Sequence, residues 1–151
     1  MEFSFEMCYK FGDIWLSDDD KACALILYPQ KKCVSLKLSL LRIRLLLTAI
    51  TSSDYKSRQY HLAAMEKMRP NLDMALIWYI GVDPNYQNRG IGTRLITQVL
   101  QRIKSCSLPV YLELSAYQYL GWFERFGFEG YEVYDCADYK FVNFFLKNDL
   151  K

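Results

Sequence analysis

The stretch VDPNYQNRGIGTRL, residues 82–95, is the most informative segment of this 151-residue chain. It follows the apolar run MALIWYIGV, residues 74–82, and leads into residues 90–104, whose apolar spacing predicts a helix. Two of the seven glycines, Gly90 and Gly92, lie at the start of that helix. Because the first N–H groups of a helix have no intrahelical partner, and glycines leave them accessible, this arrangement predicts an anion-binding site.

The segment does not match the common phosphate-binding motifs. It lacks the Gly-Lys-Ser/Thr ending of a P-loop, and its glycine spacing is not GxGxxG. Arg89 and Arg94 would add positive charge at the rim of the predicted site. The glycines by themselves leave two interpretations open: a site for a phosphate group, or a turn that lets a helix pack closely on a strand.

The composition predicts a single folded domain over residues 1–151, with 52% hydrophobic and 16% aromatic residues. A net charge of +2, without a basic stripe, disfavours nucleic acid as a partner. Five scattered cysteines and one histidine favour a reducing, cytoplasmic location and predict no metal site. The most apolar run, residues 38–50, is shorter than the roughly 20 residues of a membrane span and contains two arginines, so no membrane association is expected.

Alternation, spacing and turn residues predict the remaining elements. A hairpin is expected first, with strands around residues 14–16 and 22–28 joined by the polar turn SDDDK. The further expected elements are helices at 36–51 and 53–68, strands at 74–82 and 109–115, a short helix within 116–127, and a closing hairpin of 128–134 and 139–146. This order predicts an α/β (α+β) fold with a mixed, mostly antiparallel central sheet and flanking helices.

The sequence QNRGIG, residues 87–92, resembles the (Q/R)-x-x-G-x-(G/A) signature of the GNAT superfamily of N-acetyltransferases. A second segment, PVYLELSAYQYLGWFERFGFEGYEVY at residues 109–134, is similar to the strand, helix and Y-E-R-x-G-F segment that follow in that family. The two lie in the family's order and spacing. The resemblance implies a GNAT-like fold with a shortened N-terminus, because residues 1–11 leave room only for the tail of its opening strand and helices.

The resemblance implies acetyl-CoA as cosubstrate. Backbone amides of the signature would bind the pyrophosphate, and the edge of the strand at residues 80–82 would pair with the pantetheine arm. It also implies that the strand of Trp78 diverges from that of Leu112, with the thioester in the gap. The implied cofactor-binding residues are Ile80, Gly81, Val82, Gln87, Asn88, Arg89, Gly90, Ile91, Gly92, Thr93, Tyr119 and Phe123.

The implied reaction is acetyl transfer to a primary amine by direct attack, with a base acting through water. A lysine-like amine has a pKa of about 10.4 and is mostly protonated at pH 7, so a base lowers the cost of reaction. Glu113, on the strand beside the gap, is the candidate base; the alternative is a half-exposed carboxylate with no catalytic role. The amide of Val82 is the candidate donor to the oxyanion.

The second segment departs from the family at one helix. Family members often read N-x-P-F-Y-E-R, with the tyrosine protonating the coenzyme sulfur, whereas this chain reads YLGWFER at residues 119–125. The tyrosine position holds Phe123 and the asparagine position holds Tyr119. Tyr119, four residues earlier on the predicted helix, is the candidate acid. The alternatives are that no acid is needed, since a thiol of pKa near 8.5 leaves readily, or that both aromatics only pack.

Three functions remain open on the sequence. The leading prediction is an N-acetyltransferase that acts on a small-molecule amine. The second is a non-catalytic acetyl-CoA-binding domain, such as a sensor or regulatory subunit, and the third is a structural subunit without cofactor. A shortened N-terminus would leave part of the sheet uncovered, which favours a homodimer.

Overall fold

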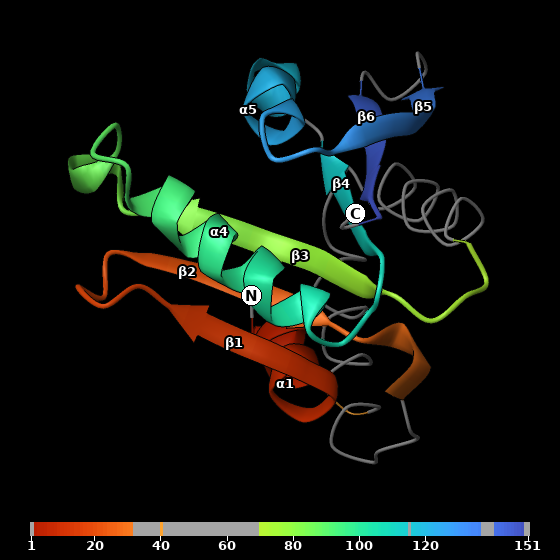
Figure 1. Ribbon diagram of the computed structural model, residues 1–151, viewed down its shortest axis with the longest axis horizontal. Helices are drawn as coiled ribbons and strands as arrows, with labels where there is room; N and C mark the ends of the chain where they lie inside the picture. Colours follow the sequence, from red (N-terminus) through yellow and green to blue (C-terminus); the bar gives the residue numbers. More distant parts are fainter. Residues whose placement is uncertain (1, 32–39, 41–69, 115, 137–140, 150–151) are drawn as a thin grey trace.

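The computed structural model describes residues 2–31, 40, 70–114, 116–136 and 141–149 (Figure 1). The helices expected at 36–51 and 53–68 lie outside the described residues, except for residue 40. The described elements are α1 (Glu2–Phe11), β1 (Gly12–Leu16), β2 (Ala22–Leu27), the short 3-10 turn η1 (Pro29–Lys31), β3 (Ala75–Val82), η2 (Pro84–Tyr86), α4 (Ile91–Lys104), β4 (Val110–Leu114), η3 (Tyr117–Tyr119), α5 (Leu120–Glu124), β5 (Glu129–Cys136) and β6 (Phe141–Asn148).

The described strands form one sheet of six in the order β1-β2-β3-β4-β6-β5 (Figure 1). Only β3 and β4 pair in parallel, while the other four neighbouring pairs are antiparallel. The predicted mixed, mostly antiparallel sheet with flanking helices is therefore confirmed. The predicted hairpin is also present, with β1 and β2 joined through the polar turn.

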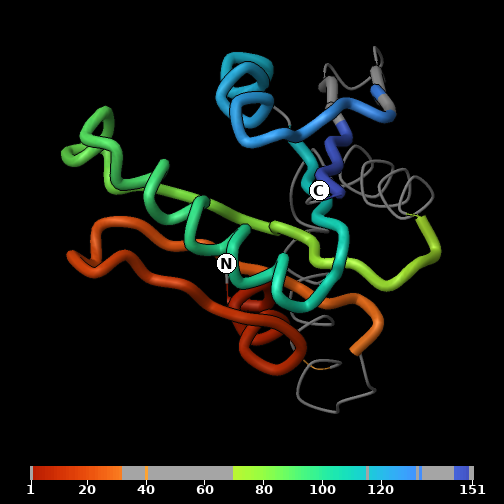
Figure 2. Tube along the Cα trace, viewed as in Figure 1, coloured from red at the N-terminus to blue at the C-terminus, as the bar shows by residue number. Residues whose placement is uncertain are grey.

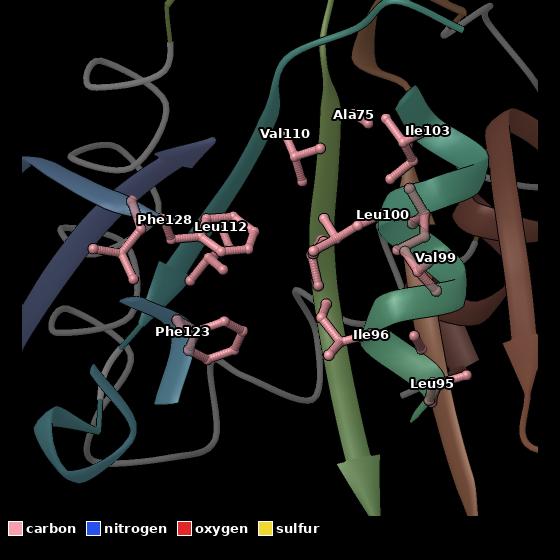
Figure 3. Close-up of a cluster of buried hydrophobic side chains, with 14 of the residues drawn as sticks. Ala75, Leu95, Ile96, Val99, Leu100, Ile103, Val110, Leu112, Phe123 and Phe128 are labelled. Carbon is pink, nitrogen blue, oxygen red and sulfur yellow. The ribbon is translucent and has the colours of Figure 1, made fainter. Parts of the chain in front are cut away.

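Helices cover both faces of the sheet because the strands are apolar on both sides. Figure 3 shows the cluster on one face, where α4 side chains such as Leu95 and Val99 lie beside side chains of β3 and β4. On the other face, Met7 and Cys8 of α1 pack with Leu25 and Leu27 of β2. Residues 2–11, expected to supply only the tail of the opening elements, therefore form a ten-residue helix with a buried face of its own.

A β-bulge in β3 changes the direction of that strand halfway along it. Ile26 pairs with Ile77 and Leu25 pairs with Tyr79, so Trp78 is an extra residue. Ile77 and Ile80 consequently face the same α4-side cluster, although they are three residues apart. Because a bulge bends a strand and increases its twist, β3 turns away from its neighbour at this point.

The parallel pairing of β3 with β4 ends where the bulge begins. It comprises only Ala75 with Val110, Leu76 with Tyr111, and Ile77 with Leu112. Among the described strands, the second half of β3 has a partner on the β2 side alone. The divergence that the resemblance implied between the strands of Trp78 and Leu112 is thus present, and among the described strands it leaves one backbone edge of β3 without a partner.

Candidate functional site

The loop between β3 and α4 is held by its own hydrogen bonds. The carboxylate of Asp83 accepts a hydrogen bond from the amide of Asn85 at 2.9 Å, and the Asp83 carbonyl accepts one from the amide of Tyr86 at 2.8 Å. The side chain of Gln87 donates to the carbonyl of Val82 at 3.2 Å. The chain then turns into α4 through two left-handed residues, Asn88 with φ 60° and Gly90 with φ 76°.

The first turn of α4 presents open N–H groups. Gly90 is the N-cap residue, makes no side-chain capping hydrogen bond, and accepts the first helical bond from the amide of Arg94 at 3.0 Å. Within the described part of the chain, no group accepts a hydrogen bond from the amides of Ile91, Gly92 or Thr93. The helix dipole adds partial positive charge at this end, so the geometry suits an anion.

The two glycines of the signature serve different purposes. Gly90 adopts a left-handed conformation that costs an L side chain energy. Gly92 lies where a Cβ atom would be 3.2 Å from Val82 Cγ2 and 3.8 Å from Trp122 Cζ2, so it permits close packing of α4 on β3 and α5. Gly90 thus serves the turn into α4 and Gly92 serves the packing of α4, while the phosphate site stays a prediction.

The free edge of β3 lies directly before this loop. Ile80, Gly81 and Val82 pair with Ala24, Cys23 and Ala22 of β2. The side chains of Ile80 and Val82 are half-buried against the α4-side cluster. Gly81 is exposed, and a Cβ atom added there would have no heavy atom within 4 Å. The structure therefore brings the strand residues and the signature residues of the sequence prediction to one end of β3.

The candidate acid and its neighbour lie in different surroundings. Phe123 is 5% exposed, and its ring centroid lies 4.8 Å from that of Trp122 and 5.6 Å from that of Phe128. Tyr119 is 49% exposed and ends η3, so it caps α5 from outside the helix. The predicted common helix of Tyr119 and Phe123 is therefore wrong, because the first turn is 3-10 and α5 begins at Leu120.

The candidate base lies on the opposite face of the sheet from Phe123. Glu113 is half-buried on β4, one residue beyond the last pair with β3. Leu112 and Leu114 belong to the cluster that contains Phe123 and α4. Because successive strand residues point to opposite faces, Glu113 is on the α1 face.

The turn between β1 and β2 lies beside the first half of α4. Ser17 Oγ accepts a hydrogen bond from the amide of Ala22 at 2.9 Å and donates to Asp19 Oδ1 at 2.6 Å. This hydroxyl holds the pKa of the exposed Asp19 carboxyl below its usual value. A pocket of about 280 Å³, lined on its far side by Ile91 and Arg94, separates the turn from α4.

Lys21 and Tyr86, at this end of the sheet, were not predicted as site residues from the sequence. The ammonium of Lys21 lies over the ring of Tyr86, at 4.8 Å from its centroid, and the guanidinium of Arg89 lies over the same ring at 5.2 Å. No sequence signal links Lys21 to the loop, because their contact depends on the register of β2 with β3.

Comparison with known families identifies the class of the chain. The model of the acetyltransferase (GNAT) domain matches residues 54–130, which is about half of the chain. The chain therefore belongs to the GNAT family of acetyltransferases, an enzyme family in the acyltransferase class. This match confirms the resemblance carried by the two sequence segments.

Solved structures with similar folds include other GNAT members. The ribosomal-protein-S18-alanine N-acetyltransferase from Escherichia coli is 16% identical, with a TM-score of 0.49, over 85% of this chain and 60% of that protein. A GNAT acetyltransferase from Desulfovibrio desulfuricans is 19% identical, with a TM-score of 0.47, over 55% and 57% of the two chains. Arabidopsis thaliana Naa50, in complex with the bisubstrate analogue CoA-Ac-MVNAL, is 21% identical, with a TM-score of 0.44, over 50% and 54%. The chain thus spans less than two thirds of each of these proteins.

Two further features concern metals and membranes. Within the described ranges, no group of three or more His, Cys, Asp or Glu side chains could hold a metal ion. Among the helices that the structure describes, none combines the length and the apolar character that a membrane crossing requires.

Proposed function

We propose that this chain transfers an acetyl group from acetyl-CoA to a primary amine. The observation that carries the proposal is that, among the described residues, the open amides at the start of α4 and an unpaired strand edge lie together at one end of β3. The open amides of residues 91–93 suit a diphosphate, and the free edge at Ile80 to Val82 suits an extended arm that contains amides. Coenzyme A carries both groups in one molecule.

The proposed cofactor contacts follow from this arrangement. Backbone amides from Gln87 to Gly92, with Thr93, would hold the diphosphate, where Gly90 keeps the helix start free of a side chain. The backbone of Ile80, Gly81 and Val82 would pair with the pantetheine arm. Tyr119 and Phe123 would lie at the thioester end of the bound coenzyme A. The exposed ring of Tyr119 would contact it directly, and the buried Phe123 would hold α5 in place beside it.

The bound cosubstrate would supply an acyl group activated as a thioester. Glu113 would take the proton of the attacking amine through water as the new C–N bond forms. The amide of Val82 would donate a hydrogen bond to the developing oxyanion. The Tyr119 hydroxyl would give its proton to the departing sulfur as the C–S bond breaks, and the proton balance closes through solvent.

The acetyl-transfer reaction is tested by measuring free thiol release from acetyl-CoA. The panel should contain small-molecule amines, the proposed acceptors, together with peptides that have free N-termini. Peptides are included because the Escherichia coli protein is named for a ribosomal-protein alanine. Amine-dependent release with at least one acceptor supports the proposal. Binding of acetyl-CoA without release over the whole panel would contradict it.

The role of Tyr119 has a direct test. We expect Tyr119→Phe to lower kcat by about a hundredfold or more, the range that a general acid contributes. The free energy of unfolding should change little, since the ring is half-exposed. Steady-state kinetics at saturating substrates measure the effect. A kcat equal to that of the wild type would show that Tyr119 is not the acid and that the thiolate leaves without one.

One observation favours a second function, the binding of acetyl-CoA without catalysis. Phe123 occupies the position at which related sequences carry the acidic tyrosine, and it is buried between Trp122 and Phe128. Calorimetry with acetyl-CoA separates the candidates. Binding without turnover would support a sensor or regulatory domain, and no binding at millimolar ligand would leave only the structural role.

A further inference from the structure

Two cations, Lys21 and Arg89, lie over the ring of Tyr86 in the loop that follows β3. Lys21 Nζ lies 4.8 Å and Arg89 Cζ lies 5.2 Å from the centroid of the Tyr86 ring. The two positive groups are therefore within about 10 Å of each other. A cation over an exposed aromatic face gains about 0.5–1 kcal/mol, so the ring can hold both against their mutual repulsion.

These two cations have no carboxylate partner in the described part of the chain. The ion pair found among the described residues joins Lys147 to Asp149, on β6 and just beyond it. Four aspartates lie in the same two segments: Asp18, Asp19, Asp20 and Asp83. Asp19 accepts hydrogen bonds from the Ser17 hydroxyl and the backbone amide of Lys21, and Asp83 accepts one from the amide of Asn85. The positive end of α4 lies immediately after Arg89. Lys21, Arg89 and the amino end of α4 therefore lie close together, and no carboxylate among the described residues forms an ion pair with either cation.

Hydrogen bonds fix the relative position of the two segments. The amide of Asp83 donates to the carbonyl of Lys21 at 2.8 Å, and Ala22 pairs with Val82. Tyr86 is tied to Asp83 by the 2.8 Å bond between its amide and the Asp83 carbonyl, and its ring packs against the α4-side cluster. Figure 2 shows the β1–β2 turn and the loop before α4 at the same end of the trace.

We propose that Lys21 is a further cofactor-binding residue, which acts with Arg89 on a phosphate group of coenzyme A, and that Tyr86 positions both cations. The inference rests on the proposed function. The group that Lys21 and Arg89 would bind is a doubly charged phosphate close to the first amides of α4. Coenzyme A offers two such groups, the diphosphate and the ribose 3′-phosphate, which the experiment below distinguishes.

The experiment is calorimetric titration of the full chain with coenzyme A and with dephospho-coenzyme A, which lacks the 3′-phosphate. We expect Lys21→Met to weaken coenzyme A binding about tenfold and to reduce the dependence of affinity on salt. An equal loss with both ligands assigns Lys21 to the diphosphate. A loss with coenzyme A alone assigns it to the 3′-phosphate.

The matched control is Lys31→Met. Lys31 also lies over a tyrosine ring, 4.3 Å from the centroid of Tyr28, but at the other end of β2. This variant removes the same charge and the same kind of contact, and we expect it to leave affinity for both ligands unchanged. An equal loss of affinity in the two variants would contradict the proposal, since it would show a general effect of net charge.

The positioning role of Tyr86 is tested by two substitutions. Tyr86→Phe keeps the aromatic face, so we expect affinity and salt dependence close to those of the wild type. Tyr86→Leu removes the face, so we expect the loss seen with Lys21→Met, with thermal unfolding used to correct for stability. If both Lys21→Met and Tyr86→Leu bind coenzyme A with wild-type affinity, the inference about Lys21 is overturned and the proposed function is not. A wild-type chain that binds neither ligand would overturn the proposed function itself.

Discussion

The hydroxyl of Tyr28 makes the stability of the β1–β2 hairpin sensitive to pH. It donates a 2.7 Å hydrogen bond to Asp13 Oδ2, and its ring is buried against the α4-side cluster. Burial and the Asp13 carboxylate raise the pKa of Tyr28 well above its usual value near 10. Because the folded chain holds this proton more tightly, the contribution to stability is complete below about pH 10 and is lost as the pH rises through the folded-state pKa.

Tyr28→Phe is therefore expected to lower the free energy of unfolding at pH 7 by about 1–3 kcal/mol, since it removes a hydrogen bond to a charged group. Above pH 10, the free energy of unfolding of this variant should fall less steeply with pH than that of the wild type. Urea unfolding at pH 7, 9 and 10.5 measures both effects. Tyr9→Phe is the control, because Tyr9 is 72% exposed. An alkaline loss as steep in Tyr28→Phe as in the wild type would assign that loss to other groups.

Gly12 is a residue at which an added methyl group has no room. A Cβ atom there would lie 1.8 Å from the carbonyl oxygen of Ile26, which is backbone and cannot move without displacing β2. We expect Gly12→Ala to lower the free energy of unfolding by about 3 kcal/mol or more, at the upper end of overpacking effects.

The control for this substitution is Gly81→Ala. A Cβ atom at Gly81 would have no heavy atom within 4 Å, so we expect a change of about 0.5 kcal/mol or less. Urea unfolding of the three proteins side by side makes the comparison. Equal stability of the two variants would mean that the β1–β2 register adjusts to the methyl group.

At the scale of the element, the start of α4 depends on a left-handed residue. Gly90 has φ 76°, a conformation that costs most L residues about 1–2 kcal/mol but that asparagine tolerates better. We expect Gly90→Ala to be destabilised by about that amount and Gly90→Asn by clearly less. Thermal unfolding at neutral pH measures the difference. The reverse order would show that the loop relaxes out of the left-handed conformation.

Elements with local signals were predictable from the sequence. Alternation and a polar turn predicted β1 and β2, and the spacing of apolar residues predicted α4 to within one residue of its start at Ile91. The break after Tyr119 was not predictable, because η3 and α5 have the same residue types as a continuous short helix. The bulge at Trp78 was not predictable from its pattern either, because residues 77–80 are all apolar and therefore give no alternation to follow.

At the scale of the whole molecule, the sheet collects the proposed site from distant segments. The signature predicted the loop and the helix start, since their chemistry lies within seven consecutive residues, 87–93. The sequence could not predict that Lys21 joins Arg89, because the pairing of Ala22 with Val82 creates that proximity. The edge of β3 that has no partner among the described strands arises in the same way, from the bulge in β3 and the position of β4.

The free edge of β3 leads to a prediction about backbone protection. In the chain without ligand, N–H groups of residues 78–82 that point away from β2 have no strand partner among the described residues. They should exchange with deuterium faster than N–H groups of β6, which is paired on both sides by β4 and β5. Addition of coenzyme A should slow exchange in peptides that cover residues 78–93.

Hydrogen–deuterium exchange with mass spectrometry, with and without saturating coenzyme A, measures this protection. Peptides of β6 serve as the internal control, and their exchange should stay the same because both edges of that strand are already paired. Protection of residues 87–93 without residues 78–82 would mean that the anion is held but the arm does not pair with β3. Calorimetric binding with no protection in either segment would place coenzyme A elsewhere on the molecule, because a ligand that pairs with backbone must slow the exchange of the amides it covers.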